Sequence, residues 1–403
     1  MEVESRSGIT IGEYPMQTVA PLALISMEGC TNLGDKVNDY LLKWTTEPES
    51  DVLLTFPGFD KNTFLIESFC PRFGTGEGKG VLRESVRGYD LYILCDVTNY
   101  RKTYPMYGIE TMMSPDDHFQ DLKRIIAAAN SKAQRVTVIM PYLYEGRQHR
   151  RTMRESLDCA MALHELVNMG VDNIITFDAH DPRVQNAIPF SSFENVMPSY
   201  QMLKALLHDQ ADLSLDKEHM MIVSPDEGAA YRNIYYASML EVDMGLFYKR
   251  RDYTRLEHGR NPIVAHEYLG SSVEGKDVFI ADDMLASGES ILDVAKGLKA
   301  RKARRIFIAQ TFALFTNGYE EFDKAYESGL FDRVLATNLT YLDPALIEKP
   351  WFLPVDMSKY IAYIIATLNH DASVSNLLNP SDRIHRLLAN YRTMQDKQTK
   401  LDV

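Results

Sequence analysis

The segment VFIADDMLASGES, residues 278–290, combines the residue types of a sugar-phosphate site. An apolar run leads into the neighbouring carboxylates Asp282 and Asp283 and then into a turn of small residues that includes Ser287. Hydroxyls and backbone N–H groups at the start of a helix bind a phosphate dianion. The carboxylates can hold neighbouring ribose hydroxyls or a magnesium ion. The alternative is an ordinary strand–helix connection that Ser287 caps. The two acids and the whole small-residue turn together favour the phosphate site.

A basic segment, Lys249 to Arg251, follows the strand expected at 245–248. A bare Lys-Arg-Arg sequence is more often a solvated strand end than a functional site. The long polar segment 251–274 follows directly and is expected to be a mobile functional loop that could exclude water. His180 also follows an expected strand, but a lone histidine there is more often structural than a metal ligand.

These residues need a scaffold, and the hydrophobic pattern predicts one. Short apolar runs alternate with helical patterns, which favours an α/β fold with parallel sheets flanked by helices. Two stretches, residues 24–195 and 196–350, each contain a strand that ends in an acidic turn, which suggests two similar domains. Strands are predicted at 92–95, 136–140, 174–177, 220–223, 245–248, 278–281, 306–310 and 333–336. Helices are predicted at 119–130, 153–169, 200–207, 229–240, 291–300 and 319–326.

Composition limits the class of protein. The chain has 403 residues, 45% of them hydrophobic and 25% charged, and its net charge of −13 argues against a nucleic-acid partner. No stretch approaches about 18 uninterrupted apolar residues, so no membrane span is expected. The first ten residues lack the pattern of a signal peptide, and we expect a cytoplasmic protein. The cysteines have no CxxC spacing and are expected to be reduced thiols: Cys30, Cys70, Cys95 and Cys159.

The phosphate segment resembles the 5-phosphoribosyl 1-pyrophosphate (PRPP) loop of phosphoribosyltransferases and of ribose-phosphate pyrophosphokinases. Further segments resemble the second family alone, in its order and spacing. They are RFGTGE (72–77), ESVRGYD (84–90), PYLYEGRQHRR (141–151), TFDAH (176–180), SPDEG (224–228), KRR (249–251), VEGKD (273–277) and SVSNL (373–377). Each match is weak alone, but their joint order from about residue 26 to residue 378 is specific.

The resemblance to ribose-phosphate pyrophosphokinases implies two phosphoribosyltransferase-type α/β domains. The expected division is an N-terminal arm at residues 1–22, an N-terminal domain at 23–195 and a C-terminal domain at 196–354 that carries the phosphate segment. A C-terminal segment, residues 355–385, with a helix near 356–368, is expected to return to the first domain.

The same resemblance implies an enzyme that transfers the β,γ-pyrophosphoryl group of ATP to the anomeric hydroxyl of ribose 5-phosphate, giving PRPP and AMP. Such chemistry depends on positioning and charge neutralisation. The implied cofactor is Mg²⁺, the implied ligands are ATP and ribose 5-phosphate, and no membrane partner is expected. A homo-oligomer is also implied, built from dimers, with a hexamer as one such form.

Individual roles follow from the resemblance as well. Lys249 and Arg251 would be the catalytic cations. ATP would be bound by Phe73, Thr75, Gly76, Glu77, Arg147 and Gln148, and the segment 72–77 would serve the site of a neighbouring subunit. Magnesium would be bound by His180 and Asp226. Ribose 5-phosphate would be bound by Asp282, Asp283, Ala286, Ser287, Gly288, Glu289 and Ser290.

Several positions depart from the family pattern. Thr75, His149 and Ala286 stand where the family has aspartates, and Glu289 adds a carboxylate to the phosphate turn. Two alternatives therefore stay open. One is a catalytically weak regulatory paralogue that assembles with an active enzyme, although Lys249 and His180 are retained. The other is a phosphoribosyltransferase that consumes PRPP, which would need no ATP and release no AMP.

Overall fold

The chain folds into two compact α/β units. The computed structural model describes residues 18–46, 56, 61–129, 132–251 and 263–401. The first unit holds the described residues up to Met197 together with Asn338–Tyr341 and Asp356–Leu378. The second unit holds the described residues from Pro198 to Thr337, Leu342–Val355 and the chain from Asn379 onward. The backbone therefore passes from one unit to the other five times.

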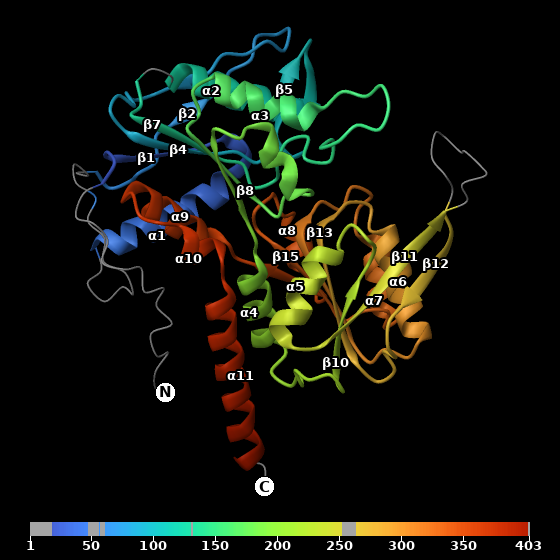
Figure 1. Ribbon diagram of the computed structural model, residues 1–403. Coiled ribbons are helices and arrows are strands. Elements are labelled where there is room, and N and C mark those ends of the chain that lie inside the picture. The colour runs from blue at the N-terminus through green and yellow to red at the C-terminus, as the bar shows by residue number, and fades with distance from the viewer. Residues whose placement is uncertain (1–17, 47–55, 57–60, 130–131, 252–262, 402–403) are drawn as a thin grey trace. The chain divides into compact units, whose positions relative to one another are not determined.

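A five-stranded parallel sheet forms the centre of the first unit (Figure 1). Its order is β1–β4–β7–β8–β9, with bounds Leu22–Ser26, Asp90–Leu94, Arg135–Ile139, Asn173–Phe177 and Ser192–Val196. One face is covered by α2 (Pro115–Ala129) and α3 (Asp158–Asn168), and the other by α1 (Thr31–Thr46) and α9 (Ser358–Asn369). Trp44 of α1 stacks on Tyr363 of α9 with ring centroids 4.5 Å apart.

Two small antiparallel pairs extend the first unit. β2 (Ser68–Phe69) pairs with β3 (Val81–Leu82), and β5 (Thr103–Met106) pairs with β6 (Ile109–Met112). The β5–β6 turn has positive φ at Tyr107 (50°) and Gly108 (76°). Two successive residues with positive φ match the twist of a tight hairpin.

A seven-stranded sheet forms the centre of the second unit, in the order β12–β11–β10–β13–β14–β15–β16. The strand bounds in that order are Ile263–Leu269, Asp243–Arg251, Met220–Ser224, Asp277–Leu285, Ile306–Ala313, Arg333–Thr337 and Phe352–Val355. Only the β11–β12 pair of this sheet is antiparallel among the described strands. Its helices are α4 (Ser199–Asp209), α5 (Ala230–Leu240), α6 (Glu289–Ala300), α7 (Glu320–Glu327) and α11 (Ser381–Leu401).

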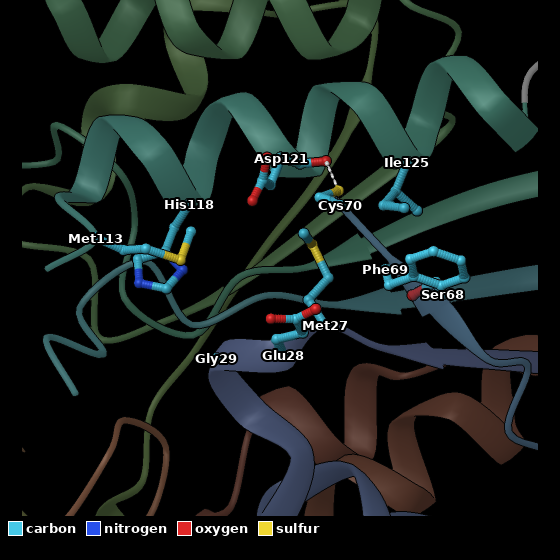
Figure 2. Close-up of a pocket in the computed structure, with 10 residues that line it drawn as sticks. All are labelled: Met27, Glu28, Gly29, Ser68, Phe69, Cys70, Met113, His118, Asp121 and Ile125. Atoms are coloured by element: carbon cyan, nitrogen blue, oxygen red, sulfur yellow. Dashed lines mark hydrogen bonds between the residues drawn. The ribbon is translucent and has the colours of Figure 1, made fainter. Parts of the chain in front are cut away.

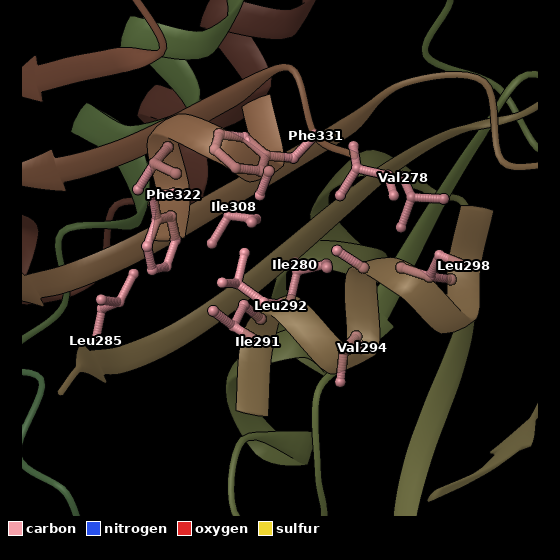
Figure 3. Close-up of a cluster of buried hydrophobic side chains, with 14 of the residues drawn as sticks. Val278, Ile280, Leu285, Ile291, Leu292, Val294, Leu298, Ile308, Phe322 and Phe331 are labelled. Carbon is pink, nitrogen blue, oxygen red and sulfur yellow. The ribbon is translucent and has the colours of Figure 1, made fainter. Parts of the chain in front are cut away.

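Two apolar clusters lie against this sheet. One joins β13 and β14 to α6 and α7, and Figure 3 shows Val278 and Ile280 of β13 near Ile291 and Leu298 of α6. The other joins the sheet to α4, α5 and α11. Because both faces of this sheet are buried, the sequences of its central strands are continuously apolar and do not alternate between apolar and polar residues.

The predicted fold class is confirmed. Every predicted strand and helix is present, with ends displaced by at most five residues. The sequence analysis missed several elements, among them β1, α1, β9, β12, β16 and α11. In the described part of the chain, no helix is long and apolar enough to cross a membrane.

The unit boundaries differ from the expected ones: the first unit runs to Met197, includes Asn338–Tyr341 and resumes at Asp356. The differences at the N-terminal arm and at the C-terminal return are larger. Leu22, assigned to the N-terminal arm, is the first residue of β1, and residues 1–17 of that arm lie outside the described chain. The C-terminal return ends at Leu378 instead of residue 385. The reason is that α11 packs on the second unit, where Ile384 and Leu388 are buried in the cluster with α4 and α5.

Candidate active site

The predicted phosphate turn connects β13 to α6 in the second unit. β13 continues through Leu285, so Asp282 and Asp283 are strand residues, not turn residues. α6 begins at Glu289, two residues before the expected start near Ile291. The turn is therefore only three residues long, 286–288, and it lies directly between two rigid elements.

Gly288 determines the shape of this turn. It is the N-cap of α6 with φ of 82°, and a Cβ atom placed on it would lie 2.3 Å from the ring of Phe322. Glycine is the residue that adopts this backbone without strain, and it has no side chain to occupy the N–H groups of the first helical turn. Those groups are suited to an anion. Ser287 is therefore not the helix cap that the alternative interpretation required. Around Gly288, the other predicted residues are half-buried (Ala286, Ser287) or exposed (Glu289, Ser290).

Two neighbouring carboxylates, Asp282 and Asp283, lie near the end of β13, and the first of them pairs with a cation. Asp283 is buried and Asp282 is partly exposed. Burial and the neighbouring Asp283 raise the pKa of Asp282 well above its ordinary value, while Arg232 of α5 opposes this increase. The Arg232 guanidinium lies 3.3 Å from Asp282 Oδ1. The sequence analysis did not identify Arg232, whose only sequence signal is its position shortly after the segment 224–228.

Asp226 belongs to the same edge of the sheet. It follows β10, the neighbour of β13 in the sheet, and its charge also raises the pKa of Asp282. Its Oδ1 accepts backbone N–H groups from Gly228 at 3.0 Å and Ala229 at 3.2 Å. Asp226 therefore shapes its own turn while it places a carboxylate near Asp282.

Lys249 and Arg251 are the last residues of β11, which is longer than predicted. Their strand partners are His266 and Ile263 of β12, with an irregularity between residues 250 and 251. The expected long loop at 251–274 is therefore wrong in its second half, because β12 occupies Ile263–Leu269. Tyr268 of β12 packs on Phe247 with ring centroids 5.2 Å apart. Residues 252–262 lie outside the described chain.

The predicted ATP segment, residues 72–77, forms a tight loop between β2 and β3 in the first unit. The Phe73 N–H donates to Glu77 O at 2.7 Å, and the Thr75 hydroxyl donates to Glu77 Oε2 at 2.9 Å. Gly76 has φ of 92°. Phe73 is 58% exposed, so its ring is available to a ligand or partner.

The β5–β6 hairpin supports this loop. The Tyr107 N–H donates to Gly74 O at 2.8 Å, and a Cβ atom on Gly76 would lie 2.9 Å from Met106 Sδ. The Arg72 guanidinium lies over the Tyr104 ring, 4.8 Å from its centroid. The β5–β6 hairpin, which is not among the segments that resemble the family, thus contacts the loop that is expected to bind nucleotide.

The segments after β7 and β8 bring His149 and His180 together. Their ring centroids are 5.5 Å apart, and His149 Nε2 lies 3.4 Å from Asp181 Oδ2. Burial lowers the pKa of His149, although Asp181 opposes this effect. Arg147 is exposed. Gln148 Nε2 donates within its own loop, to Arg150 O at 3.1 Å and to Ser156 O at 3.0 Å.

The two predicted metal ligands belong to different units of the chain. No group of three or more His, Cys, Asp or Glu side chains that could hold a metal occurs in the described ranges. His180 belongs to the first unit and Asp226 to the second. The predicted ATP residues likewise belong to the first unit, and the basic and ribose-phosphate residues to the second.

A small cavity in the first unit is lined by none of the predicted site residues. Figure 2 shows its lining, which includes Met27, Cys70, His118 and Asp121. Its volume of about 20 Å³ is on the scale of one water molecule. Burial raises the pKa of Cys70 to about 12, so its thiol is protonated and a poor nucleophile. All four cysteines are free, as predicted.

Comparison with known proteins gives two adjacent family matches. Residues 22–170 match the N-terminal domain of ribose phosphate pyrophosphokinase, and residues 191–344 match the phosphoribosyl transferase domain. The ribose-phosphate pyrophosphokinase of Vibrio parahaemolyticus is 27% identical over 321 residues, which covers 78% of this chain and 92% of that protein. The enzyme of the same name from Mycoplasma genitalium is 27% identical over 292 residues, covering 69% of this chain and 80% of that protein.

A solved structure shares the fold. The crystal structure of phosphoribosylpyrophosphate synthetase from Mycobacterium smegmatis superposes with a TM-score of 0.68 and 20% identity. The match covers 87% of this chain and 100% of that chain. Both α/β units therefore have counterparts in a known architecture.

Proposed function

Because this chain belongs to the ribose-phosphate pyrophosphokinase family, we propose that it transfers the pyrophosphoryl group of ATP to the C1 hydroxyl of ribose 5-phosphate. The products are PRPP and AMP. The bond that breaks joins Pβ to the oxygen that bridges Pα and Pβ, and this oxygen leaves as part of AMP. The bond that forms joins the sugar C1 oxygen to Pβ as the C1 hydroxyl loses its proton. The chain is an enzyme of the transferase class.

The Gly288 turn is the observation that carries this proposal. It presents the N-terminal backbone donors of α6 beside Asp282, whose carboxylate suits the two ribose hydroxyls. A phosphate bound at the turn and a diol bound by Asp282, near the end of β13, together describe ribose 5-phosphate. Ser287 and Ser290 add hydroxyls to the phosphate side, and Asp283 supports Asp282 from within the strand.

The remaining roles concern ATP. Phe73 stacks on the adenine, while Thr75, Gly76, Glu77, Arg147 and Gln148 bind the rest of the nucleotide. Lys249 and Arg251 neutralise the charge that develops on the migrating pyrophosphoryl group, which is the main catalytic task in such transfers. The described hydrogen bonds of Gln148 within its own loop mean that it must turn outward, or act through its loop, when ATP binds.

Magnesium is the proposed cofactor, with Asp226 and His180 as its protein contacts. Carboxylate oxygens are the donors magnesium prefers, and it usually takes one or two of them together with substrate phosphates. Imidazole is a less suitable donor, so His180 acts through bound water. Burial, and then the neighbouring carboxylates of Asp283 and Asp226, raise the pKa of Asp282, and a bound cation would offset the charge of these carboxylates. Magnesium, when bound, neutralises the phosphate oxygens of ATP.

The active form is proposed to be a cytoplasmic homo-oligomer built from dimers. The loop 72–77 and the phosphate turn belong to different units of the chain, and Phe73 is exposed. An exposed aromatic ring on a rigid loop is suited to completing a site on a second copy.

One assay tests the proposed function. The purified protein is incubated with ribose 5-phosphate, ATP and magnesium, and AMP and PRPP are quantified. Equal amounts of both products support the proposal. In a second incubation, with PRPP and a nucleobase but no ATP, consumption of PRPP would identify a phosphoribosyltransferase. No turnover of either mixture by the pure chain would favour a regulatory paralogue.

A further inference from the structure

Asn233 is a buried amide in α5 that none of the predicted roles uses. Its side chain is fully buried, with 0% exposure. We propose that Asn233 is a positioning residue that fixes Asp282 relative to the Asp226 turn and thereby sets the affinity for ribose 5-phosphate. This inference rests on the proposed function, because it assigns a role to the site that binds the sugar.

The Asn233 amide substitutes for a missing strand partner. The pairing of β10 with β13 ends at Ile222 and Phe279, two residues before Ala281. The Ala281 N–H donates to Asn233 Oδ1 at 3.0 Å, and Asn233 Nδ2 donates to Ala281 O at 2.7 Å. An amide presents one acceptor and one donor group side by side, as a backbone residue does. If the Asn233 amide were flipped, Nδ2 would face the Ala281 N–H and Oδ1 would face the Ala281 carbonyl oxygen. These two hydrogen bonds therefore fix the orientation of the amide.

The same amide reaches the loop that carries Asp226. Asn233 Nδ2 lies 2.9 Å from Ala229 O and 3.4 Å from Ser224 Oγ. The Ser224 hydroxyl in turn donates to Asp226 O at 2.7 Å. One side chain therefore connects both ends of the Asp226 turn to the last residue before Asp282.

Arg232 and Asn233 then act on Asp282 in two ways. Arg232 pairs with its carboxylate, and Asn233 holds the backbone of the preceding residue. Buried polar groups of the backbone need partners, so loss of the amide would force β13 or the Asp226 turn to move. The movement would occur at the position where the proposed sugar hydroxyls bind.

The test is Asn233→Leu, which keeps the approximate volume and removes both polar groups. We expect the KM for ribose 5-phosphate to rise by about tenfold, the effect of one good interaction, while the KM for ATP stays within about twofold. Calorimetric titration with ribose 5-phosphate, in the presence of magnesium and a non-hydrolysable ATP analogue, should show the same loss of affinity.

Asn369→Leu is the matched control. Asn369 is also a fully buried asparagine, and its Nδ2 donates to Ala20 O and Asp90 Oδ2 in the first unit. Both substitutions should lower the melting temperature, but only Asn233→Leu should change the KM for ribose 5-phosphate. If Asn233→Leu does not fold, Ser224→Ala tests the same connection, with an expected increase of about twofold to threefold in that KM.

The outcomes separate the two proposals. An unchanged KM for ribose 5-phosphate in an active variant, or an equal change in the Asn369→Leu control, overturns the positioning role and leaves the proposed function intact. A wild-type protein that neither binds ribose 5-phosphate nor forms AMP overturns both.

Discussion

Gly288 makes the phosphate turn depend on a single residue type. Gly288→Ala should lower the free energy of unfolding, because alanine in the left-handed region costs about 1–2 kcal/mol and its Cβ would also collide with Phe322. The KM for ribose 5-phosphate should rise as well. Thermal unfolding and steady-state kinetics measure the two effects.

Gly329→Ala is the control for this change. Gly329 has φ of 73°, but a Cβ atom there meets no atom within 4 Å. Gly329→Ala should lose only the stability that alanine costs in a left-handed backbone conformation, and its KM for ribose 5-phosphate should be unchanged. If both variants lose equal stability and bind ribose 5-phosphate normally, the Phe322 contact does not shape the turn.

Substitution of Lys249 should change kcat more than it changes the affinity for ATP. Lys249→Ala should reduce kcat by about 10²–10³, the usual effect of losing one contact to a charge that develops in the transition state. The affinity for ATP should change little. Lys296→Ala, which removes an exposed lysine paired with Asp293, is the control and should leave kcat intact. A kcat for Lys249→Ala close to that of the wild type would contradict its catalytic role.

The residues proposed to bind ATP and ribose 5-phosphate could be proposed from the sequence, because they lie in short segments that follow the order of the family. Arg232 and Asn233 could not, since they lie inside a helix whose sequence does not reveal which side faces β13. The two hydrogen bonds between Asn233 and Ala281 form because the β10–β13 pairing ends before Ala281. The end of a strand pairing is set by packing rather than by local sequence.

At the scale of elements, the β5–β6 hairpin should control nucleotide binding. Replacing residues 103–112 with a short glycine–serine linker removes the Tyr107 N–H contact to Gly74 and the Met106 contact to Gly76. The loop 72–77 should then lose its support, so the KM for ATP should rise by about tenfold, while that for ribose 5-phosphate stays constant.

Exposed side chains of the hairpin provide the control. Tyr107 and Ile109 are 78% and 68% exposed. Replacing both with serine keeps the hairpin backbone and its bond to Gly74, so the KM for ATP should stay near the wild-type value. An increase in the doubly substituted protein would show that the ring and not the backbone contact matters.

The elements that the sequence analysis missed have weak local signals. α1 is rich in polar residues, and its core face appears only as the spacing of Leu33, Val37, Leu41 and Trp44. β12 is a seven-residue strand, IVAHEYL, that shows no regular alternation of apolar and polar residues and lies inside a segment whose composition is typical of a loop. The parallel central strands were found because burial on both faces makes them continuously apolar.

At the scale of the whole molecule, a site shared between chains should allow complementation. Glu77→Ala and Lys249→Ala chains, each of low activity, are mixed under conditions that permit subunit exchange. Activity should partly return, because some sites then combine an intact loop 72–77 with an intact β11. Sedimentation at the assay concentration supplies the second measurement. A fully active monomer, or no recovery after demonstrated exchange, would contradict a shared site.

The five passages of the backbone between units also restrict how this protein can change over evolution. The first unit needs α9, whose Tyr363 stacks on Trp44, although α9 is encoded after nearly all of the second unit. No continuous piece of the gene therefore specifies the first unit without most of the second. A truncation, a fusion or a recombination event between residues 197 and 198 would separate the first unit from α9, so the two units must be inherited and duplicated as one piece.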